Sequence, residues 1–311
     1  MIHVALLIAP IFGLIVLGHV LRRGGIPSFE FWLLNDKLVY WVLMPSLLFY
    51  KTSTTEFDIA LLGAFAMAVL GGFAIALLYG IAVWRFSSLS GATASSVMQG
   101  SARHNTFIAL ALAELMFGQD GLAMATLVSA MLIPTTNLTV VSLMVIMTSN
   151  KTGFGLIPSI LRDLMRNPLL LAVGAGISCN YLIASEIPIL HDMTRILGQA
   201  ALPIVLLSVG ASIRIRAMAA SAIPMLLATL GKMIMFPTVT FIIAYGIGLT
   251  ETQTMIALLF ASAPTASASY TLARQMDGDA PVMAAIVTVQ TAMSFISIPV
   301  TLVLAQAFFN T

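Results

Sequence analysis

The chain has 311 residues, of which 59% are hydrophobic and only 8% are charged, and its mean hydropathy is +1.03. Soluble domains carry about 25% charged residues, so the composition indicates an integral membrane protein. The 14 Lys and Arg residues are scattered along the chain, which argues against nucleic acid as a partner. The single cysteine, Cys179, excludes an internal disulfide.

Ten stretches of the sequence meet the requirement of about 20 largely apolar residues for a membrane-spanning helix. They cover residues 3–21, 33–50, 59–84, 93–116, 121–148, 156–183, 189–212, 218–247, 252–274 and 280–309. We therefore predict an all-α membrane protein embedded in the lipid bilayer. Its organisation would be residues 1–148 with five spans, a linker over 149–155, and residues 156–311 with five more.

The distribution of basic residues predicts the orientation. If the N-terminus lies outside, ten of the 14 Lys and Arg residues fall in inside loops and two in outside loops. The remaining two, Arg103 and Lys232, fall within spans. The positive-inside rule then places both termini outside the plasma (inner) membrane.

The two halves of the chain show weak internal similarity. A shift of 158 residues superposes three prolines and glycines of the first half on three of the second: Pro10 on Pro168, Gly18 on Gly176 and Pro45 on Pro203. A shift of 160 superposes Leu112, Ala113, Met116 and Gly118 on Leu272, Ala273, Met276 and Gly278. Because each half holds five spans, an odd number, the second half would enter the membrane upside down. Inverted repeats are typical of secondary transporters.

Spans four and nine are predicted to be broken near the middle of the membrane. Span four contains the polar run from Gln99 to Thr106, and span nine contains Ser262 to Ser269 around Pro264. Proline removes a backbone donor and clashes with the preceding turn, and irregular backbone is tolerated in a membrane only where it is buried or lines a cavity. We expect further helix breaks at Gly100, Pro45 and Pro203. Inward-pointing helix N-termini would favour an anion.

Several polar residues in these spans are candidates for binding a substrate. Arg103 could pair with a carboxylate, although it could also reach the membrane surface or pair with Glu114. His104 could couple transport to protons, or serve only as a structural hydrogen-bonding group. For Lys232 we favour a partner in broken backbone. The wider candidate set for substrate binding also includes Gln99, Thr106, Ser46, Pro264, Thr265, Ser267 and Gln290, whereas Gln290 and Asn137 could equally be packing groups.

Motifs along nearly the whole chain resemble the auxin efflux carrier family of transporters. They are Pro45-Ser-Leu-Leu-Phe49, Asn105-Thr106, Ala263-Pro264 with Leu272-Ala273-Arg274, and Ile298-Pro299-Val-Thr-Leu-Val303. The resemblance implies two inverted five-helix repeats with crossing helices four and nine, a scaffold-like panel and a transport-like core. It also implies that Asn105 contacts a substrate carboxylate and that the protein forms a homodimer.

This chain departs from the family at two places. The family follows its span-four asparagine with Gly-x-Pro where this chain has Leu110-Ala111-Leu112, and many plant members have a second ninth-span proline where Ser269 stands. The ligand of this chain could therefore differ from theirs.

The predicted function is secondary active transport of an organic acid anion by elevator-type alternating access, and the resemblance implies an auxin-like carboxylate or a dicarboxylate as the substrate. No H-E-x-x-H, G-x-S-x-G or Walker motif is present, so we predict no enzyme, no cofactor and no metal. Two alternatives stay open: a sodium-coupled symporter like the bile acid carriers, and a passive anion channel. Spans four and nine contain no Asp, which gives little support to a sodium site built from carboxylates.

Overall fold

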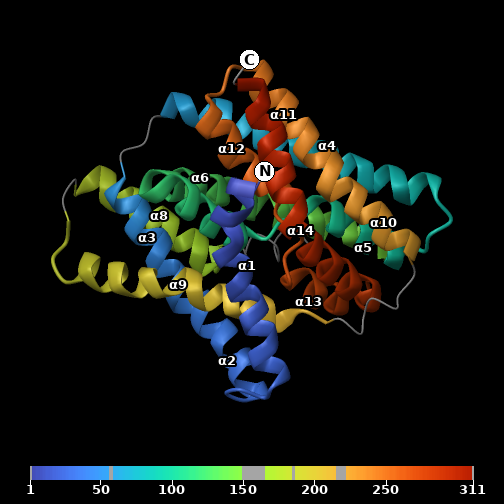
Figure 1. Cartoon of the computed structure of the whole chain (residues 1–311), viewed down its shortest axis with the longest axis horizontal. Helices are drawn as coiled ribbons and strands as arrows, with labels where there is room; N and C mark the ends of the chain where they lie inside the picture. Colours follow the sequence, from blue (N-terminus) through green and yellow to red (C-terminus); the bar gives the residue numbers. More distant parts are fainter. Residues whose placement is uncertain (1, 56–58, 149–164, 184–185, 215–221, 310–311) are drawn as a thin grey trace.

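The computed structural model describes residues 2–55, 59–148, 165–183, 186–214 and 222–309, and the regular structure in these ranges is helical (Figure 1). The predicted linker 149–155 and the first residues of spans six and eight lie outside the described residues. The helices are α1 (Ile2–Arg23), α2 (Phe29–Leu38), α3 (Met44–Thr54), α4 (Ile59–Phe86), α5 (Gly91–Ala102), α6 (Thr106–Thr148), α8 (Pro168–Leu182), α9 (Leu190–Ser212), α10 (Ala222–Leu230), α11 (Phe236–Gly246), α12 (Glu251–Ser262), α13 (Ala268–Gln275) and α14 (Ala280–Phe309).

Six stretches of the described chain are long and apolar enough to cross a membrane. They are Leu6–Arg23, Gly63–Phe86, Gly91–Thr148, Leu190–Ser212, Ala222–Gly246 and Ala280–Phe309. A bilayer core of about 30 Å needs about 20 helical residues, so the 58-residue stretch from Gly91 is too long for one straight crossing. It is interrupted after Ala102 and bends again at Gly118, whose φ is +64°. The chain is therefore an integral membrane protein.

The described part of the chain contains two helices interrupted by a short irregular segment. Residues 103–105 separate α5 from α6, and residues 263–267 separate α12 from α13. Both interruptions fall where the polar runs of the sequence predicted them. In two other places the helix widens to a π turn without stopping: η1 (Val39–Leu43) joins α2 to α3, and η4 (Gly231–Met235) joins α10 to α11.

Of the four residues predicted to break helices, only Pro264 lies in an interruption. Gly100 lies inside α5, and Pro203 lies inside α9. Pro45 is the second residue of α3, and the preceding residues Leu43 and Met44 keep a right-handed helical backbone. The prediction of breaks at Gly100, Pro45 and Pro203 is therefore wrong. A proline removes only one helical hydrogen bond, and neighbouring helices compensate for such a loss in a membrane.

Glycines allow two pairs of helices to pack with their backbones in contact. In the α1–α9 pair, Gly18 lies against the backbone of Leu207, and Gly210 lies against the backbone of Ile15. In the α3–α8 pair, Gly176 lies against Phe49 and Thr52. Small residues at helix interfaces permit this close approach in membranes, where van der Waals contact drives association.

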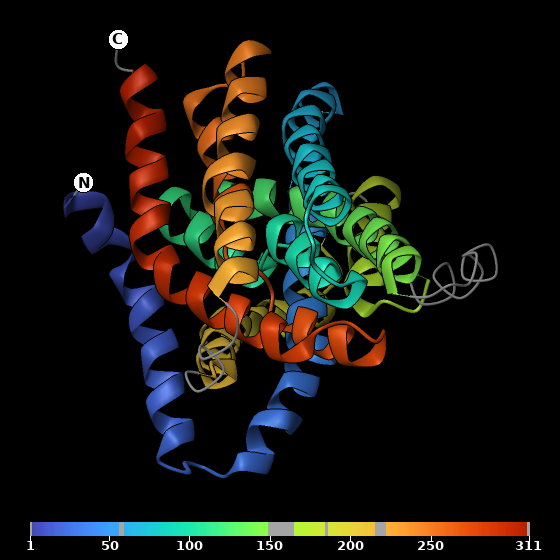
Figure 2. The ribbon, with the colours of Figure 1, turned by 90° about the vertical axis from the view of Figure 1, so that its right-hand side faces the viewer.

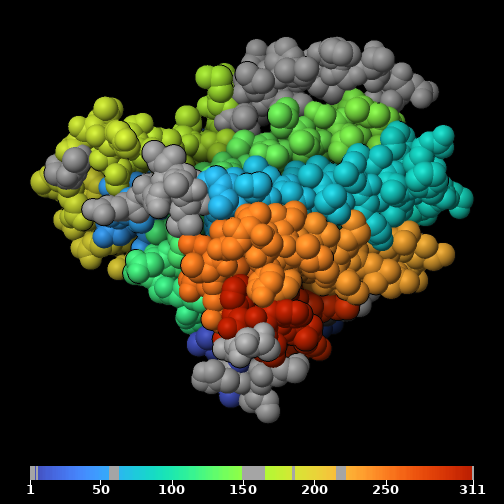
Figure 3. Space-filling view, turned by 90° about the horizontal axis from the view of Figure 1, so that it is seen from above, coloured from blue at the N-terminus to red at the C-terminus, as the bar shows by residue number. Residues whose placement is uncertain are grey.

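The long helices run beside one another across the molecule. Figure 2 shows the first turn of α1 and the last turn of α14 toward one end, with the turn between α1 and α2 at the other. Figure 3 shows α4 and α11 side by side on one face, where Gly72 of α4 packs against Thr240 and Phe236. The largest cluster of buried apolar side chains extends through α1, α3, α4, α6, α9, α11 and α12, and it includes Ala102 and Ala263 at the edges of the two interruptions.

The glycine contact in α1 generates a prediction about stability. Replacing Gly18 with Ala would place a methyl group inside the backbone of Leu207, and such overpacking typically costs about 1–3 kcal/mol. We expect Gly18→Ala to lower the midpoint of thermal unfolding of the detergent-solubilised protein. Gly13→Ala is the matched control on the same helix, because a methyl group there meets nothing within 4 Å. Equal midpoints for the two variants would contradict the close α1–α9 contact.

Candidate functional site

The two interrupted helices meet at their irregular segments. The backbone N–H of Asn105, between α5 and α6, donates a hydrogen bond of 2.7 Å to the carbonyl of Pro264, between α12 and α13. This bond joins segments about 160 residues apart in the sequence. It brings the two polar runs into one place surrounded by buried apolar side chains.

Pro264 leaves a carbonyl without its helical partner, and Lys232 compensates. In an α-helix the Phe260 carbonyl would accept from the N–H four residues later, but residue 264 is proline and has none. The Nζ of Lys232 lies 3.4 Å from the Phe260 carbonyl oxygen and 4.4 Å from the ring centroid of Phe236. Lys232 is fully buried. Its placement agrees with the favoured sequence interpretation, a partner for broken backbone.

Gln290 of α14 forms hydrogen bonds with backbone groups at both interruptions and on α10. Its Nε2 donates to the carbonyls of Gly100 (2.9 Å) and Ala228 (3.2 Å), and its Oε1 accepts from the backbone N–H of Thr265 (3.0 Å). The hydroxyl of Thr265 lies 2.7 Å from Oε1 of Gln290 and 2.9 Å from the Gly100 carbonyl oxygen, so its one proton is shared between these two acceptors. Thr265 and Gln290 are both buried, so these two residues connect α5, α10, α14 and the α12–α13 interruption. Their main role here is structural.

Asn105 caps α6 and keeps one unused donor. Its Oδ1 accepts from the backbone N–H groups of Phe107 (3.1 Å) and Ile108 (3.3 Å), which is the usual behaviour of an asparagine at a helix N-terminus. The Nδ2 of Asn105 has no acceptor among the described residues. The cap orients the side chain, and the amide N–H groups stay available to a ligand.

Arg103 lies between α5 and α6 and does not pair with Glu114. Its Nη2 lies 3.4 Å from Oδ1 of Asn137, on the second part of α6, while Glu114 accepts from Gln119. The Nη1 of Arg103 is buried without a hydrogen-bond partner. The one ion pair found within the described ranges joins Arg195 to Asp192, so the guanidinium of Arg103 has no carboxylate there.

The remaining residues predicted to bind substrate do not share one environment. His104 is buried with its ring 5.7 Å from that of Phe260, and its Nδ1 has no partner. Thr106 begins α6, and Ser267 directly precedes α13. Ser46 lies on α3, where its hydroxyl donates to the Val42 carbonyl of its own helix. The hydrogen bond of the Ser46 hydroxyl is therefore made away from both interruptions.

Sequence reasoning did not single out Phe260 as part of this site. Its carbonyl binds Lys232, and its ring contacts His104. The available signal was its position four residues before Pro264, because the carbonyl there must lose its helical partner. The ring contact had no signal in the sequence, since it depends on the meeting of two distant segments.

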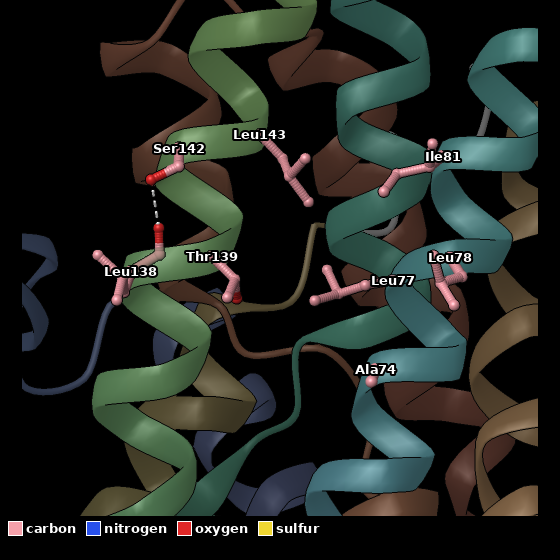
Figure 4. Close-up of a pocket in the computed structure, with 8 residues that line it drawn as sticks. All are labelled: Ala74, Leu77, Leu78, Ile81, Leu138, Thr139, Ser142 and Leu143. Carbon is pink, nitrogen blue, oxygen red and sulfur yellow. Dashed lines mark hydrogen bonds between the residues drawn. The ribbon is translucent and has the colours of Figure 1, made fainter. Parts of the chain in front are cut away.

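An apolar groove on the surface is separate from this site. It has a volume of about 470 Å³ and lies between α4 and the second part of α6 (Figure 4). The residues that line it are Ala74, Leu77, Leu78, Ile81, Leu138, Thr139, Ser142 and Leu143. The hydroxyl of Ser142 bonds the Leu138 carbonyl of its own helix, and Leu78 and Leu138 are exposed. An apolar face of this kind suits contact with lipid.

The apolar helices and the buried polar interruptions together define a membrane transport protein. A family profile described as "membrane transport protein" matches residues 3–302 of the 311. The chain therefore belongs to this auxin efflux carrier-type family of membrane transporters. A search of curated proteins finds no match.

The contacts of Gln290 predict a large loss of stability when its amide is removed. Gln290→Leu leaves the Thr265 N–H buried without a partner and removes the side-chain hydrogen bonds to the Gly100 and Ala228 carbonyls, and an unsatisfied buried group costs about 1–3 kcal/mol. We expect a fall of at least about 1–3 kcal/mol in the free energy of unfolding, measured by denaturation in detergent. Thr291→Val is the neighbouring control, because the Thr291 hydroxyl bonds only the Val287 carbonyl of its own helix. A loss no larger than that of the control would disprove the structural role of Gln290.

Proposed function

We propose that the protein is a secondary carrier of organic acid anions that works by elevator-type alternating access. The observation that carries this proposal is the meeting of two interrupted helices at Asn105 and Pro264, with the Nδ2 of Asn105 unused. Family membership supplies the transport activity, and the chemistry of the interruptions supplies the class of substrate.

An anion fits this site for two reasons. The helix α6 begins at Thr106, directly after Asn105, and the N-terminus of a helix carries partial positive charge that favours anions. The Nδ2 group of Asn105 can donate hydrogen bonds to a carboxylate oxygen, and a neutral amide costs less to desolvate than a charged group. Interactions of this kind suit a site that binds a carboxylate and then releases it.

Reciprocal contacts support the proposal of two inverted repeats. Gly18 packs on Leu207. Gly176, which lies 158 positions after Gly18, packs on Phe49, which lies 158 positions before Leu207. A second pair of contacts shows the same relation. Ile15 contacts Gly210, and Val173, 158 positions after Ile15, contacts Thr52, 158 positions before Gly210. The Thr52 hydroxyl lies 3.5 Å from the Val173 carbonyl oxygen. A two-fold relation between the halves, with α5–α6 and α12–α13 as crossing helices, accounts for both pairs.

The packing also suggests which parts would move. The helices α1, α3, α8 and α9 form close contacts with one another through Gly18, Gly176 and Gly210, and they would form the fixed panel. The remaining helices carry both interruptions and would form the moving core. With both termini outside, as the positive-inside rule predicts, the core would expose the anion to each side in turn.

The membrane potential permits export without a coupled ion. A monovalent anion that leaves an inside-negative cell gains about 2.3 kcal/mol per 100 mV. At 1.4 kcal/mol per tenfold ratio, this gain sustains a gradient of about fifty-fold. Import coupled to protons or sodium would use the same anion site, so the ion gradient is varied in the test below.

The proposal predicts that Asn105→Asp abolishes transport and leaves the fold intact. An aspartate keeps the Oδ1 acceptor that caps α6, but it loses the amide donor and places a negative charge beside the anion. The measurement is uptake of labelled mono- and dicarboxylates into proteoliposomes, with counterflow to separate a carrier from a channel. Proton and sodium gradients are imposed in separate arms.

Ser46→Ala is the control, because the Ser46 hydroxyl bonds only its own helix. We expect it to transport at the wild-type rate, and thermal unfolding checks that both variants are folded. Wild-type transport by Asn105→Asp would refute the anion site at Asn105. Flux that depends on sodium would favour a symporter, and flux without counterflow would favour a channel.

A further inference from the structure

Lys232 is an ionisable side chain inside a membrane-spanning stretch. It lies in the π turn η4, within Ala222–Gly246, and it is fully buried. Its Nζ contacts one carbonyl oxygen, that of Phe260 at 3.4 Å, and the ring of Phe236 at 4.4 Å. Charged groups in such a setting are costly, and those found there pair with other groups or serve the movement of ions and protons. The repair of the helix break explains a donor at this position, but it does not explain a residue that can carry charge.

No acidic side chain pairs with Lys232 in the part of the chain that the structure describes. The helices in contact with η4 are α4, α5, α10, α11, α12 and α14. The titratable residues that these helices carry are Tyr79, Arg85, Tyr245 and Glu251. Tyr79 lies against Gly231, the residue before Lys232, and its hydroxyl bonds the Leu227 carbonyl. The other three lie at the ends of their helices, where Glu251 bonds Gln306.

The charged groups of the nearby interruption are basic. His104 and Arg103 lie between α5 and α6, and His104 is close enough to Lys232 and to Arg103 to be repelled by both when they are charged. Removing an ammonium from water costs more than one carbonyl and one aromatic ring can offset. An ammonium on Lys232 would therefore have no counter-charge among the described residues.

Lys232 can change its charge without losing its structural contact. A protonated lysine has three N–H donors, and the neutral amine keeps two of them together with a lone pair. Either form can therefore donate to the Phe260 carbonyl, which has lost its helical partner to Pro264. The repair of the broken helix persists in both charge states, so the proton on Nζ is free to serve another purpose.

We propose that Lys232 is neutral in the empty carrier and takes up one proton when the organic anion binds, so that the protein carries a proton and an anion together. This inference rests on the proposed function and names the ion that is coupled to transport. The proton comes from water on the side to which the site is open, and it forms an N–H bond with the lone pair of Nζ. It leaves to water on the opposite side when the anion is released.

The anion site lies close enough to supply the missing negative charge. Phe260 lies one helical turn, about 6 Å, before Pro264, and the Pro264 carbonyl bonds the backbone N–H of Asn105. Opposite charges about 8 Å apart, at an effective dielectric constant of about 20, attract strongly enough to tighten binding about thirty-fold. The coupling is reciprocal, because the anion strengthens the binding of the proton by the same factor.

The experiment drives transport with a pH gradient alone. Wild-type protein in proteoliposomes is given labelled lactate or labelled succinate, with the membrane potential held at zero by potassium and valinomycin. If one proton accompanies each anion, we expect accumulation of about tenfold per pH unit toward the alkaline side. Protein-free vesicles correct for acid that crosses the lipid unaided.

Two substitutions of Lys232 test the residue. Lys232→Met cannot take up a proton and Lys232→Arg cannot release one, so both are expected to lose accumulation driven by the pH gradient. Lys37→Met is the control, because it removes a lysine at an exposed position of α2, and it should accumulate the acid as the wild type does. His104→Gln tests the other group that can change its charge at this pH. Loss of accumulation in His104→Gln, with accumulation retained in Lys232→Met, would overturn the assignment to Lys232.

A measurement without substrate covers variants that do not transport. If Lys232 is neutral in the folded protein and charged in the unfolded chain, unfolding takes up one proton. The equilibrium constant of unfolding in detergent should then fall about tenfold per pH unit between about pH 7 and pH 9 in the wild type, relative to Lys232→Met. The lost contact with Phe260 shifts the constant of the variant equally at every pH. The same slope in both proteins would contradict a neutral Lys232.

The outcomes distinguish this inference from the proposed function. Wild-type transport that follows only the membrane potential or a sodium gradient would overturn proton coupling and leave the anion carrier standing. Transport of neither acid, nor of the wider set of labelled acids, would overturn both. Accumulation driven by the pH gradient that is lost in both Lys232 variants and kept in Lys37→Met supports the coupling.

Discussion

The structure depends on one constraint: backbone polar groups inside a membrane must find partners within the protein. Each unsatisfied N–H or C=O in hydrocarbon costs several kcal/mol. The two interruptions release several such groups, and side chains from other segments of the chain bind them. Gln290 and Thr265 bind the Gly100 carbonyl, and Lys232 binds the Phe260 carbonyl. The broken helices persist because η4, the α12–α13 interruption and α14 provide these side chains at the required positions.

This constraint separates the polar residues of the site into two groups. Thr265, Gln290 and Lys232 bond backbone groups that the interruptions expose, so their polarity is used within the protein. Gln99, Arg103 and Asn105 keep donors for which the described part of the chain provides no acceptor. Residue type does not distinguish the groups, because a glutamine occurs in each. The partners of each atom distinguish them, and we propose the second group as the ligand-binding one.

Much of the fold could be predicted from the sequence because its signals are local. The apolar stretches marked the helices, and the polar runs around Arg103 and Pro264 marked both interruptions. Helix breaks at Pro45 and Pro203 were predicted wrongly, because the effect of a proline depends on what neighbouring helices offer. The prediction of a helix break at Gly100 was also wrong. A side chain at this position would meet Ile286 and Ala228, so the glycine allows close helix packing and does not interrupt the helix.

The individual roles within the site required the three-dimensional contacts. Gln290 lies 25 residues from Thr265 and 190 from Gly100, and no local pattern relates residues so far apart. The polar run also does not reveal that the side-chain Oδ1 of Asn105 caps a helix while its Nδ2 stays unused. In the anion site that we propose, a side chain held in this way is oriented before the ligand arrives, which reduces the entropy lost on binding. A carrier has to release its substrate, so a few oriented donors serve it better than a large number of contacts.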